Sequence, residues 1–247
     1  MNFRGKVKKI FNIFVISVLV IYANLLYLLI VAFLYTSFYM SYRYKDIDRD
    51  GIINMCDDDV DGDGILNIYD DDADGDGTDN IQDALNNARC LIGRPYEQLG
   101  GEFRDVGFKF GGIVCIDLIN LAYEKAGIYF EKELRDYYYK KKEIFKNRRW
   151  NNPDDRCFAR RVINFEAYCR DRGFMLKNDE KLRPGDLISF MGRHIVMVEK
   201  VMDNDFIVIE SSGKRYFTRR TNKKELYERN IKKYGPPTFI RLQFKTN

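Results

Sequence analysis

An acidic motif of twelve residues occurs three times with a period of thirteen, beginning at Asp46, Asp59 and Asp72. Each copy has Asp at positions 1, 3, 5 and 12, Gly at position 6 and Asn at position 9. Oxygen ligands at alternating positions, with a glycine for the sharp turn, are what a loop needs to bind calcium. The pattern therefore predicts three structural Ca2+ sites, whose side-chain ligands are Asp46, Asp48, Asp50, Asn54, Asp57, Asp59, Asp61, Asp63, Asn67, Asp70, Asp72, Asp74, Asp76, Asn80 and Asp83.

These loops leave no room for the helix pairs of EF-hands, because only Asp58 or Asp71 separates one copy from the next. They resemble thrombospondin type 3 repeats, in which calcium ions organise a chain with almost no hydrophobic core. The resemblance implies a calcium-ordered stalk over residues 46–83. Without calcium, the dense negative charge favours a disordered linker. Asp instead of Glu at position 12 indicates weak affinity of the extracellular kind.

Residues 10–40 contain no charged side chain, and the run exceeds the roughly 20 apolar residues that cross a bilayer. A cleaved signal peptide would have an apolar region of only about 7–15 residues, followed by a small-residue cleavage site. The run therefore predicts an uncleaved transmembrane signal anchor. The basic residues within 1–9 predict a cytoplasmic tail, so the rest of this single-pass chain would lie in the periplasm or at the cell surface.

The charge of the chain is unevenly distributed along the sequence. Fifteen Asp residues and one Arg lie between 46 and 83, although the whole chain has a net charge of +4, so residues 84–247 are basic. A basic extracytoplasmic domain favours anionic partners such as wall polymers or lipid headgroups, and a merely solvated surface is the alternative. We expect no nucleic-acid partner.

The five cysteines make an odd number for a compartment that oxidises thiols; they are Cys56, Cys90, Cys115, Cys157 and Cys169. One of them would remain free or pair between chains. If Cys115 is the free one, the other four allow three different pairings.

The segment 107–128 predicts a helix that starts at Cys115. Apolar residues at Ile116, Ile119 and Ala122 recur at helical spacing, and Gly127 ends the pattern. Unpaired backbone N–H groups at a helix start favour the reactive thiolate. The alternative is that Cys115 is a small buried apolar residue.

A second helix is expected over residues 157–172, before Gly173. Residues 181–212 then contain a Pro-Gly turn and three apolar runs that are typical of strands. His194 begins the second run and is the only histidine in the chain. Any mechanism that needs an imidazole base must therefore use His194.

Cys115 at a helix start, followed by the motifs PGDLISF and HIVMVEK, resembles the NlpC-type papain-fold hydrolases that cut peptide bonds in bacterial cell walls. A bacterial branch of that superfamily catalogued as a domain of unknown function is still more similar, through VCIDLINLAYEKAGI and RRVINFEAYCRDRG. The resemblance covers most of residues 88–210. It implies an α+β, papain-like domain over residues 84–247 whose nucleophile helix packs on an antiparallel sheet. Cys115 would be the nucleophile and His194 the base, with no cofactor for catalysis.

Strand pairing suggests the residue that orients the imidazole. A hairpin with a three-residue loop over 201–203 would place Val198 opposite Phe206 and His194 opposite Glu210. Directly opposed residues have Cβ atoms roughly 4.5–5.5 Å apart, so Glu210 could bond one ring nitrogen and present the other to the thiol. A two-residue loop would instead bring Ser211 opposite His194.

Together these features predict a membrane-anchored cysteine peptidase or amidase that cleaves peptide or amide bonds, with peptidoglycan peptide as the expected substrate. One alternative is a calcium-dependent wall-binding or adhesion protein with an inactive papain-like domain. Another is an acyltransferase that uses the same thioester. The tyrosines and lysines of residues 137–142, with Trp150 nearby, form either a groove for a glycan or peptide or a solvated face.

Overall fold

The computed structural model describes residues 15–31, 33, 45–97, 111–146, 151–155, 157–177, 180–213 and 216–244. The chain divides into two compact units, Met1–Lys45 and Asp46–Asn247. In the first unit, residues 15–31 are helical and their side chains are exposed. Among the described residues, none of the helices has both the length and the apolar character that crossing a bilayer demands. The predicted anchor over 10–40 extends beyond the described residues at both ends, and the predicted tail over 1–9 lies wholly outside them.

The second unit is built on an antiparallel sheet of five strands in the order β4-β3-β2-β1-β5. The strands are β1 (Leu187–Phe190), β2 (His194–Val201), β3 (Phe206–Ser211), β4 (Thr218–Asn222) and β5 (Pro237–Ile240). The predicted α+β class and antiparallel sheet are confirmed, and the three apolar runs form β1, β2 and β3. Strands β4 and β5 were not expected from the sequence.

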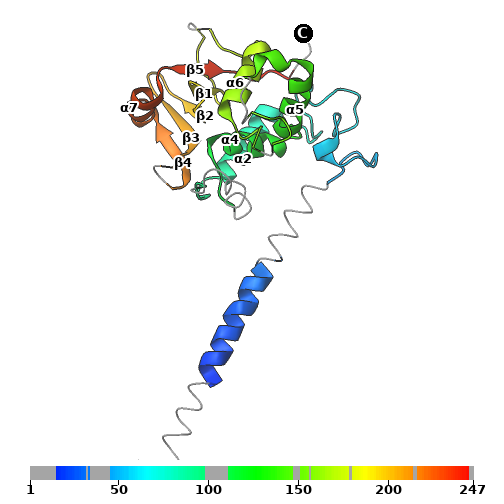
Figure 1. Cartoon of the computed structure of the whole chain (residues 1–247), viewed down its shortest axis with the longest axis vertical. Coiled ribbons are helices and arrows are strands. Elements are labelled where there is room, and N and C mark those ends of the chain that lie inside the picture. Colours follow the sequence, from blue (N-terminus) through cyan, green and yellow to red (C-terminus); the bar gives the residue numbers. More distant parts are fainter. Residues whose placement is uncertain are drawn as a thin grey trace, which may run out of the picture. The chain divides into compact units, whose positions relative to one another are not determined.

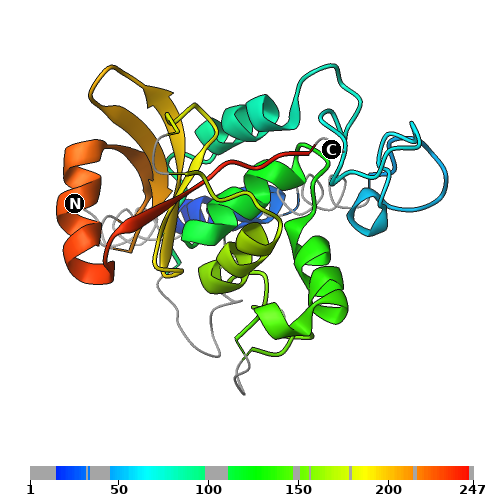
Figure 2. The ribbon, with the colours of Figure 1, turned by 90° about the horizontal axis from the view of Figure 1, so that it is seen from above.

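Both faces of the sheet are covered by helices. Ile195 and Met197 of β2 pack into the larger core with the helical layer, whereas Val196 and Val198 pack into a smaller core that includes Leu226 of α7 (Lys223–Tyr234). Figures 1 and 2 show α7 on one side of the sheet and α4 and α6 on the other. Burial on both faces explains why β2 is apolar at consecutive positions rather than at alternate ones.

The remaining helices of this unit are α2 (Asn80–Cys90), α4 (Cys115–Glu124), α5 (Phe130–Lys140) and α6 (Val162–Asp171), with 3-10 turns at Asn54–Cys56 and Lys142–Ile144. Helix α4 starts at Cys115, as predicted, and α6 starts later than the predicted residue 157. Helix α2 starts at Asn80 because the Asp79 side chain accepts from the N–H groups of Ile81 and Gln82 and thereby caps the first turn. The last predicted calcium loop therefore runs directly into a helix.

The acidic repeats pack against the helical layer. Ala73 is fully buried in the main core, and Ile68 and Ile81 pack against that core. A Cβ on Gly127, which follows α4, would lie 2.9 Å from the carbonyl oxygen of Ala73. The repeats therefore do not stand apart as the predicted stalk, because Ala73, Ile68 and Ile81 pack into or against the core that the later helices form.

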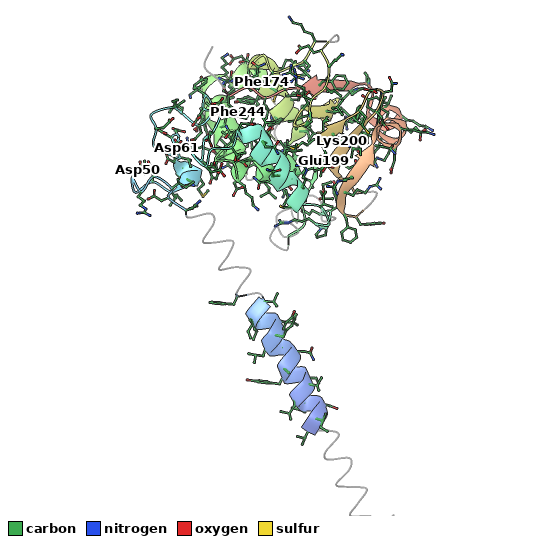
Figure 3. All side chains as sticks on the ribbon, turned by 180° about the vertical axis from the view of Figure 1, so that it is seen from behind. Asp50, Asp61, Phe174, Glu199, Lys200 and Phe244 are labelled. Carbon is green, nitrogen blue, oxygen red and sulfur yellow. The ribbon has the colours of Figure 1, made fainter. Side chains whose placement is uncertain are left out.

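Further polar contacts join the repeats to the helical layer. The Arg172 guanidinium lies over the Tyr69 ring at 5.0 Å, and Lys132 forms an ion pair with Asp58. In Figure 3, Asp50 and Asp61 lie on the opposite side of this unit from Glu199 and Lys200 of β2. The repeats thus occupy one side of the unit, away from this end of the sheet.

Candidate active site

Cys115 is the first residue of α4 and is 9% exposed. Val114 precedes it with an extended backbone, and its N–H donates to Asp117 Oδ2 at 2.8 Å. This contact closes the first turn of the helix around Cys115. The thiol therefore lies beside backbone N–H groups that no helical carbonyl can accept from.

A buried arginine holds Asp117 in place. Arg160 donates from Nε to Oδ1 at 2.8 Å and from Nη2 to Oδ2 at 2.6 Å. The same Nη2 also donates to Glu97 Oε2 at 2.5 Å. Side-chain exposure is 8% for Arg160, 3% for Asp117 and 0% for Glu97, so this cluster is almost closed to water. It fixes the start of the helix that carries Cys115.

His194 lies at the start of β2, directly opposite Phe190 of β1, and is 6% exposed. Its ring stacks on Phe190 at 6.3 Å and on Tyr234, the last residue of α7, at 6.2 Å. Its Nε2 lies 3.2 Å from Glu210 Oε2. Because Nε2 faces the carboxylate, Nδ1 is the ring nitrogen that remains for the Cys115 thiol, whose interaction with the imidazole helps to raise the pKa of His194.

The predicted register that led to Glu210 is wrong by two residues. Val198 faces Val208 rather than Phe206, because the loop contains four residues and a bulge follows between Val198 and Lys200. An offset of two keeps every side chain on its predicted face of the sheet. Glu210 is therefore a diagonal neighbour of His194 and still reaches its ring.

Ser211, the alternative partner of His194, points elsewhere. Its hydroxyl donates to the Ile113 carbonyl at 2.9 Å. This bond joins the end of β3 to the segment that leads into Cys115.

Glu210 is fully buried and accepts hydrogen bonds on both carboxylate oxygens. Thr221 donates to Oε1 at 2.6 Å, and Arg229 donates to Oε2, the oxygen that contacts His194. Arg219 lies 3.9 Å from Oε1. The carboxylate is thus held by β4 and α7 as well as by the imidazole.

These contacts shift the pKa values of both His194 and Glu210. Burial lowers the pKa of His194, but its hydrogen bonds with Cys115 and Glu210 outweigh burial and raise the pKa from 6.5 to about 9. Burial raises the pKa of Glu210, but hydrogen bonds from His194, Arg229 and Thr221 lower it to about 2. Near neutral pH the two residues therefore form an ion pair, and His194 is a stronger proton acceptor than an ordinary histidine.

The structure brings Cys115, His194 and Glu210 together, and it adds residues that the sequence reasoning missed. Arg229 and Tyr234 come from α7, and Arg160 precedes α6. The pattern Asn222-x-x-Glu225 could have indicated the start of α7, since the Asn222 side chain accepts from the Glu225 N–H at 2.9 Å. Nothing in the spacing singles out either arginine.

The three acidic loops share one local geometry. In each loop the carboxylates at positions 1, 3 and 5 supply oxygens within 4.8 Å of one another; the three groups are Asp46, Asp48, Asp50, then Asp59, Asp61, Asp63, then Asp72, Asp74, Asp76. The glycine at position 6 donates its N–H to the first aspartate at 2.9–3.1 Å. This arrangement matches the alternating oxygen ligands that Ca2+ prefers.

Several carboxylate oxygens of these loops are buried and have no hydrogen-bond donor within the described residues; they are Asp46 Oδ1, Asp57 Oδ2, Asp59 Oδ1, Asp72 Oδ1 and Asp83 Oδ2. Buried anionic oxygens without a donor are costly unless a cation pairs with them. Burial and the neighbouring aspartates Asp76, Asp74, Asp72 and Asp79 raise the pKa of Asp83 to about 6. The residues present therefore fit a hard divalent cation such as Ca2+.

The asparagines at position 9 make backbone hydrogen bonds. Asn67 accepts from the Val60 N–H at 2.8 Å and donates to the Asp57 carbonyl at 2.9 Å. Asn80 makes the equivalent bonds to Ala73 and Asp70, and the Asn54 oxygen accepts from Ile47. Asn67 and Asn80 thus hold their loops to the preceding one, whereas the Asn54 contact lies within the first loop.

The tyrosines and lysines of the predicted groove do not share one surface: some pack against other aromatic rings and others are exposed. Tyr137 packs edge-on against Tyr168, and Tyr138 packs against Phe158. Tyr139 is 66% exposed. Lys140–Lys142 lie at the exposed end of α5, and Trp150 is outside the described residues.

All five cysteines are free, so the pairings considered from the sequence do not occur in this structure. Cys56 and Cys90 are exposed, whereas Cys169 is buried in the main core. Burial raises the pKa of the Cys169 thiol well above its ordinary value.

Comparisons with known proteins place the chain in a family. Among curated proteins, none matches it. A solved structure that is similar is the P60 domain of an antigen from M. avium subspecies paratuberculosis, with 15% sequence identity, coverage of 66% of this chain and 94% of that domain, and a TM-score of 0.37. The family model described as "Domain of unknown function (DUF1287)" matches residues 95–234, which include Cys115, His194 and Glu210. The chain belongs to this DUF1287 family.

Proposed function

We propose that this protein is a cysteine hydrolase in which Cys115 is the nucleophile, His194 the proton acceptor and Glu210 the orienting group. The observation that carries the proposal is the continuous buried series from the thiol through the imidazole to a carboxylate, with the cysteine at a helix start. A nucleophile, a base and a third group that orients the base are the common signature of covalent catalysis.

The arrangement suits cleavage of an amide. His194 holds the thiol proton on Nδ1 as the imidazolium, and the Cys115 thiolate that faces it attacks the carbonyl carbon, forming a C–S bond. The imidazolium then gives its proton to the leaving amine as the C–N bond breaks. Water hydrolyses the remaining thioester, with His194 again accepting a proton. The Cys115 backbone N–H, at the helix start, is a donor for the negative charge on the carbonyl oxygen.

The proposed substrates are peptide or amide bonds of peptidoglycan. Support comes from the sequence resemblance to NlpC-type hydrolases and from the uncharged run over 10–40, which fits a membrane anchor with the enzyme outside the cytoplasm. The proposal includes structural calcium in the three repeats, supported by their clustered and unpaired carboxylate oxygens.

The test is to incubate purified peptidoglycan with the full chain in millimolar calcium and to identify released fragments by mass spectrometry. Wild type and Cys90→Ala, which changes an exposed cysteine, should release the same fragments, whereas Cys115→Ala should release none. Release of the same fragments by Cys115→Ala would refute the proposal. Binding of the wall with no release by wild type would favour the adhesion alternative. Products joined to an added amine would indicate acyl transfer.

Thiol labelling gives a measurement that needs no substrate. Although Cys115 is buried and Cys90 is exposed, iodoacetamide should modify Cys115 faster at neutral pH, because the neighbouring base removes its proton. His194→Ala should slow labelling of Cys115 by on the order of tenfold or more and leave Cys90 unchanged. Equal labelling of Cys115 in the two proteins would show that His194 does not activate it.

A further inference from the structure

Helix α7 supplies two side chains around His194 that the proposed triad does not use. Arg229 donates from Nη2 to Glu210 Oε2, the same oxygen that lies 3.2 Å from His194 Nε2. Tyr234, at the end of the same helix, stacks on the imidazole. The sheet alone therefore does not complete the site, and α7 is part of it.

Arg229 is held in a fixed position. Its side chain is 11% exposed, and its Nη1 lies 3.8 Å from Glu225, one turn earlier on α7. Glu225 also pairs with Arg219 of β4. Since Thr221 holds the other oxygen of Glu210, the carboxylate cannot turn without breaking a buried hydrogen bond.

Two positively charged groups compete for one carboxylate oxygen. When His194 is protonated, its positive charge and that of Arg229 both face Glu210 Oε2, so each reduces the stabilisation of the other. Titratable and charged groups reach the His194–Glu210 pair from every side; they are Cys115 of α4, Arg219 of β4, and Glu225, Arg229 and Tyr234 of α7. Arg229 is the one among these cations that donates directly to the oxygen shared with His194.

We propose that Arg229 is a positioning residue of the catalytic centre, which fixes the Glu210 carboxylate against His194 and shares its negative charge, so that the imidazolium releases its proton more readily than it would beside Glu210 alone. The inference rests on the proposed function, because the imidazolium must give a proton to the leaving amine. Without Arg229, Glu210 would stabilise the imidazolium more strongly. His194 would then be a poorer proton donor near neutral pH.

The single histidine makes this directly measurable in the full chain, since one labelled imidazole gives one NMR titration curve. Arg229→Met should raise the midpoint of that curve by about one pH unit or more, because a nearby positive charge is removed. Glu210→Gln should lower the midpoint. Arg229→Lys keeps the charge and should lie close to wild type.

Arg241→Met is the matched control. Arg241 is 14% exposed and makes two 2.8 Å bonds to buried Asp186, so its loss removes a comparable ion pair away from His194. The midpoint should not move in this variant. If Arg229→Met does not fold, Arg229→Gln removes the charge with a polar side chain and should move the midpoint in the same direction.

The outcomes separate this inference from the proposed function. A wild-type midpoint near 6.5, together with Cys115 labelling no faster than that of Cys90, would refute the catalytic pair itself. A wild-type midpoint near 9 that Arg229→Met leaves unchanged or lowers would refute the role of Arg229 alone. An equal rise in Arg241→Met would also refute it.

Discussion

Near neutral pH, the His194 imidazole keeps a proton that an ordinary histidine would largely have lost. Its pKa is about 9 in the folded protein against 6.5 for the free side chain, because contacts with Cys115 and Glu210 outweigh burial. A group with a raised folded pKa stabilises the fold most at a pH below its unfolded pKa. That contribution is lost as the pH rises through the folded pKa.

We expect the difference in unfolding free energy between wild type and His194→Gln to be largest below pH 6.5, to decline between pH 6.5 and 9, and to be constant above pH 9. The decline should be about 3 kcal/mol, from 1.36 kcal/mol per pKa unit. Glu210 stays ionised throughout this range because its pKa is about 2. Urea denaturation at a series of pH values measures the difference, and a difference independent of pH would contradict the His194–Glu210 ion pair.

At the scale of elements, the position of α4 depends on a buried ionic cluster. Arg160→Met would leave Asp117 and Glu97 without their shared guanidinium. Breaking a buried pair in this way costs about 3–5 kcal/mol. Arg170→Met is the control, because Arg170 is 60% exposed and pairs with Glu166 one turn away, and it should cost less than about 1 kcal/mol. Similar unfolding midpoints for the two variants would show that the cluster does not hold the nucleophile helix.

The sequence predicted the elements that carry local signals. Cys115 at a helix start and His194 at a strand start were predicted from apolar periodicity, and Glu210 was placed on the correct face because side chains alternate with a period of two. The register was wrong because the loop spans residues 202–205 rather than 201–203 and a bulge at Glu199 follows it, and neither feature leaves a mark in the apolar pattern. Arg160 and Arg229 were missed because their partners are 43 and 19 residues away in the chain, and spacing does not identify such contacts.

On the scale of the whole unit, the repeats and the sheet-bearing domain share one hydrophobic core. Helix α2 begins in the third repeat and binds α4 through Asn87, whose Nδ2 donates to the Ala122 carbonyl at 3.1 Å. Calcium in the third loop would therefore stabilise the helical layer beside the catalytic site and not only an acidic segment.

We expect calcium to raise the thermal unfolding midpoint of the entire unit in a single transition, with about three weak sites per chain by calorimetry. At one hundred times its dissociation constant, one bound ion contributes about 2.7 kcal/mol. Chelation should increase the hydrodynamic radius and expose Cys169, which is buried in the shared core. Asp72→Asn should reduce the calcium response, whereas Asp203→Asn, in an exposed turn, should not. Separate transitions for the repeats and for Cys169 would mean that the two parts unfold independently.

The residue at the fourth position of each repeat limits where a further copy of the repeat can pack. Gly62 and Gly75 occupy this position in the second and third repeats, and a Cβ on either would lie 2.9 Å from the Cβ of Asp48 or Asp61 in the preceding repeat. The first repeat instead has Arg49, with a φ of 65°. Its side chain would block another repeat from stacking there in the same way, and α2 closes the opposite end. A further copy that packs in the same way would therefore need glycine at the fourth position of the repeat that follows it.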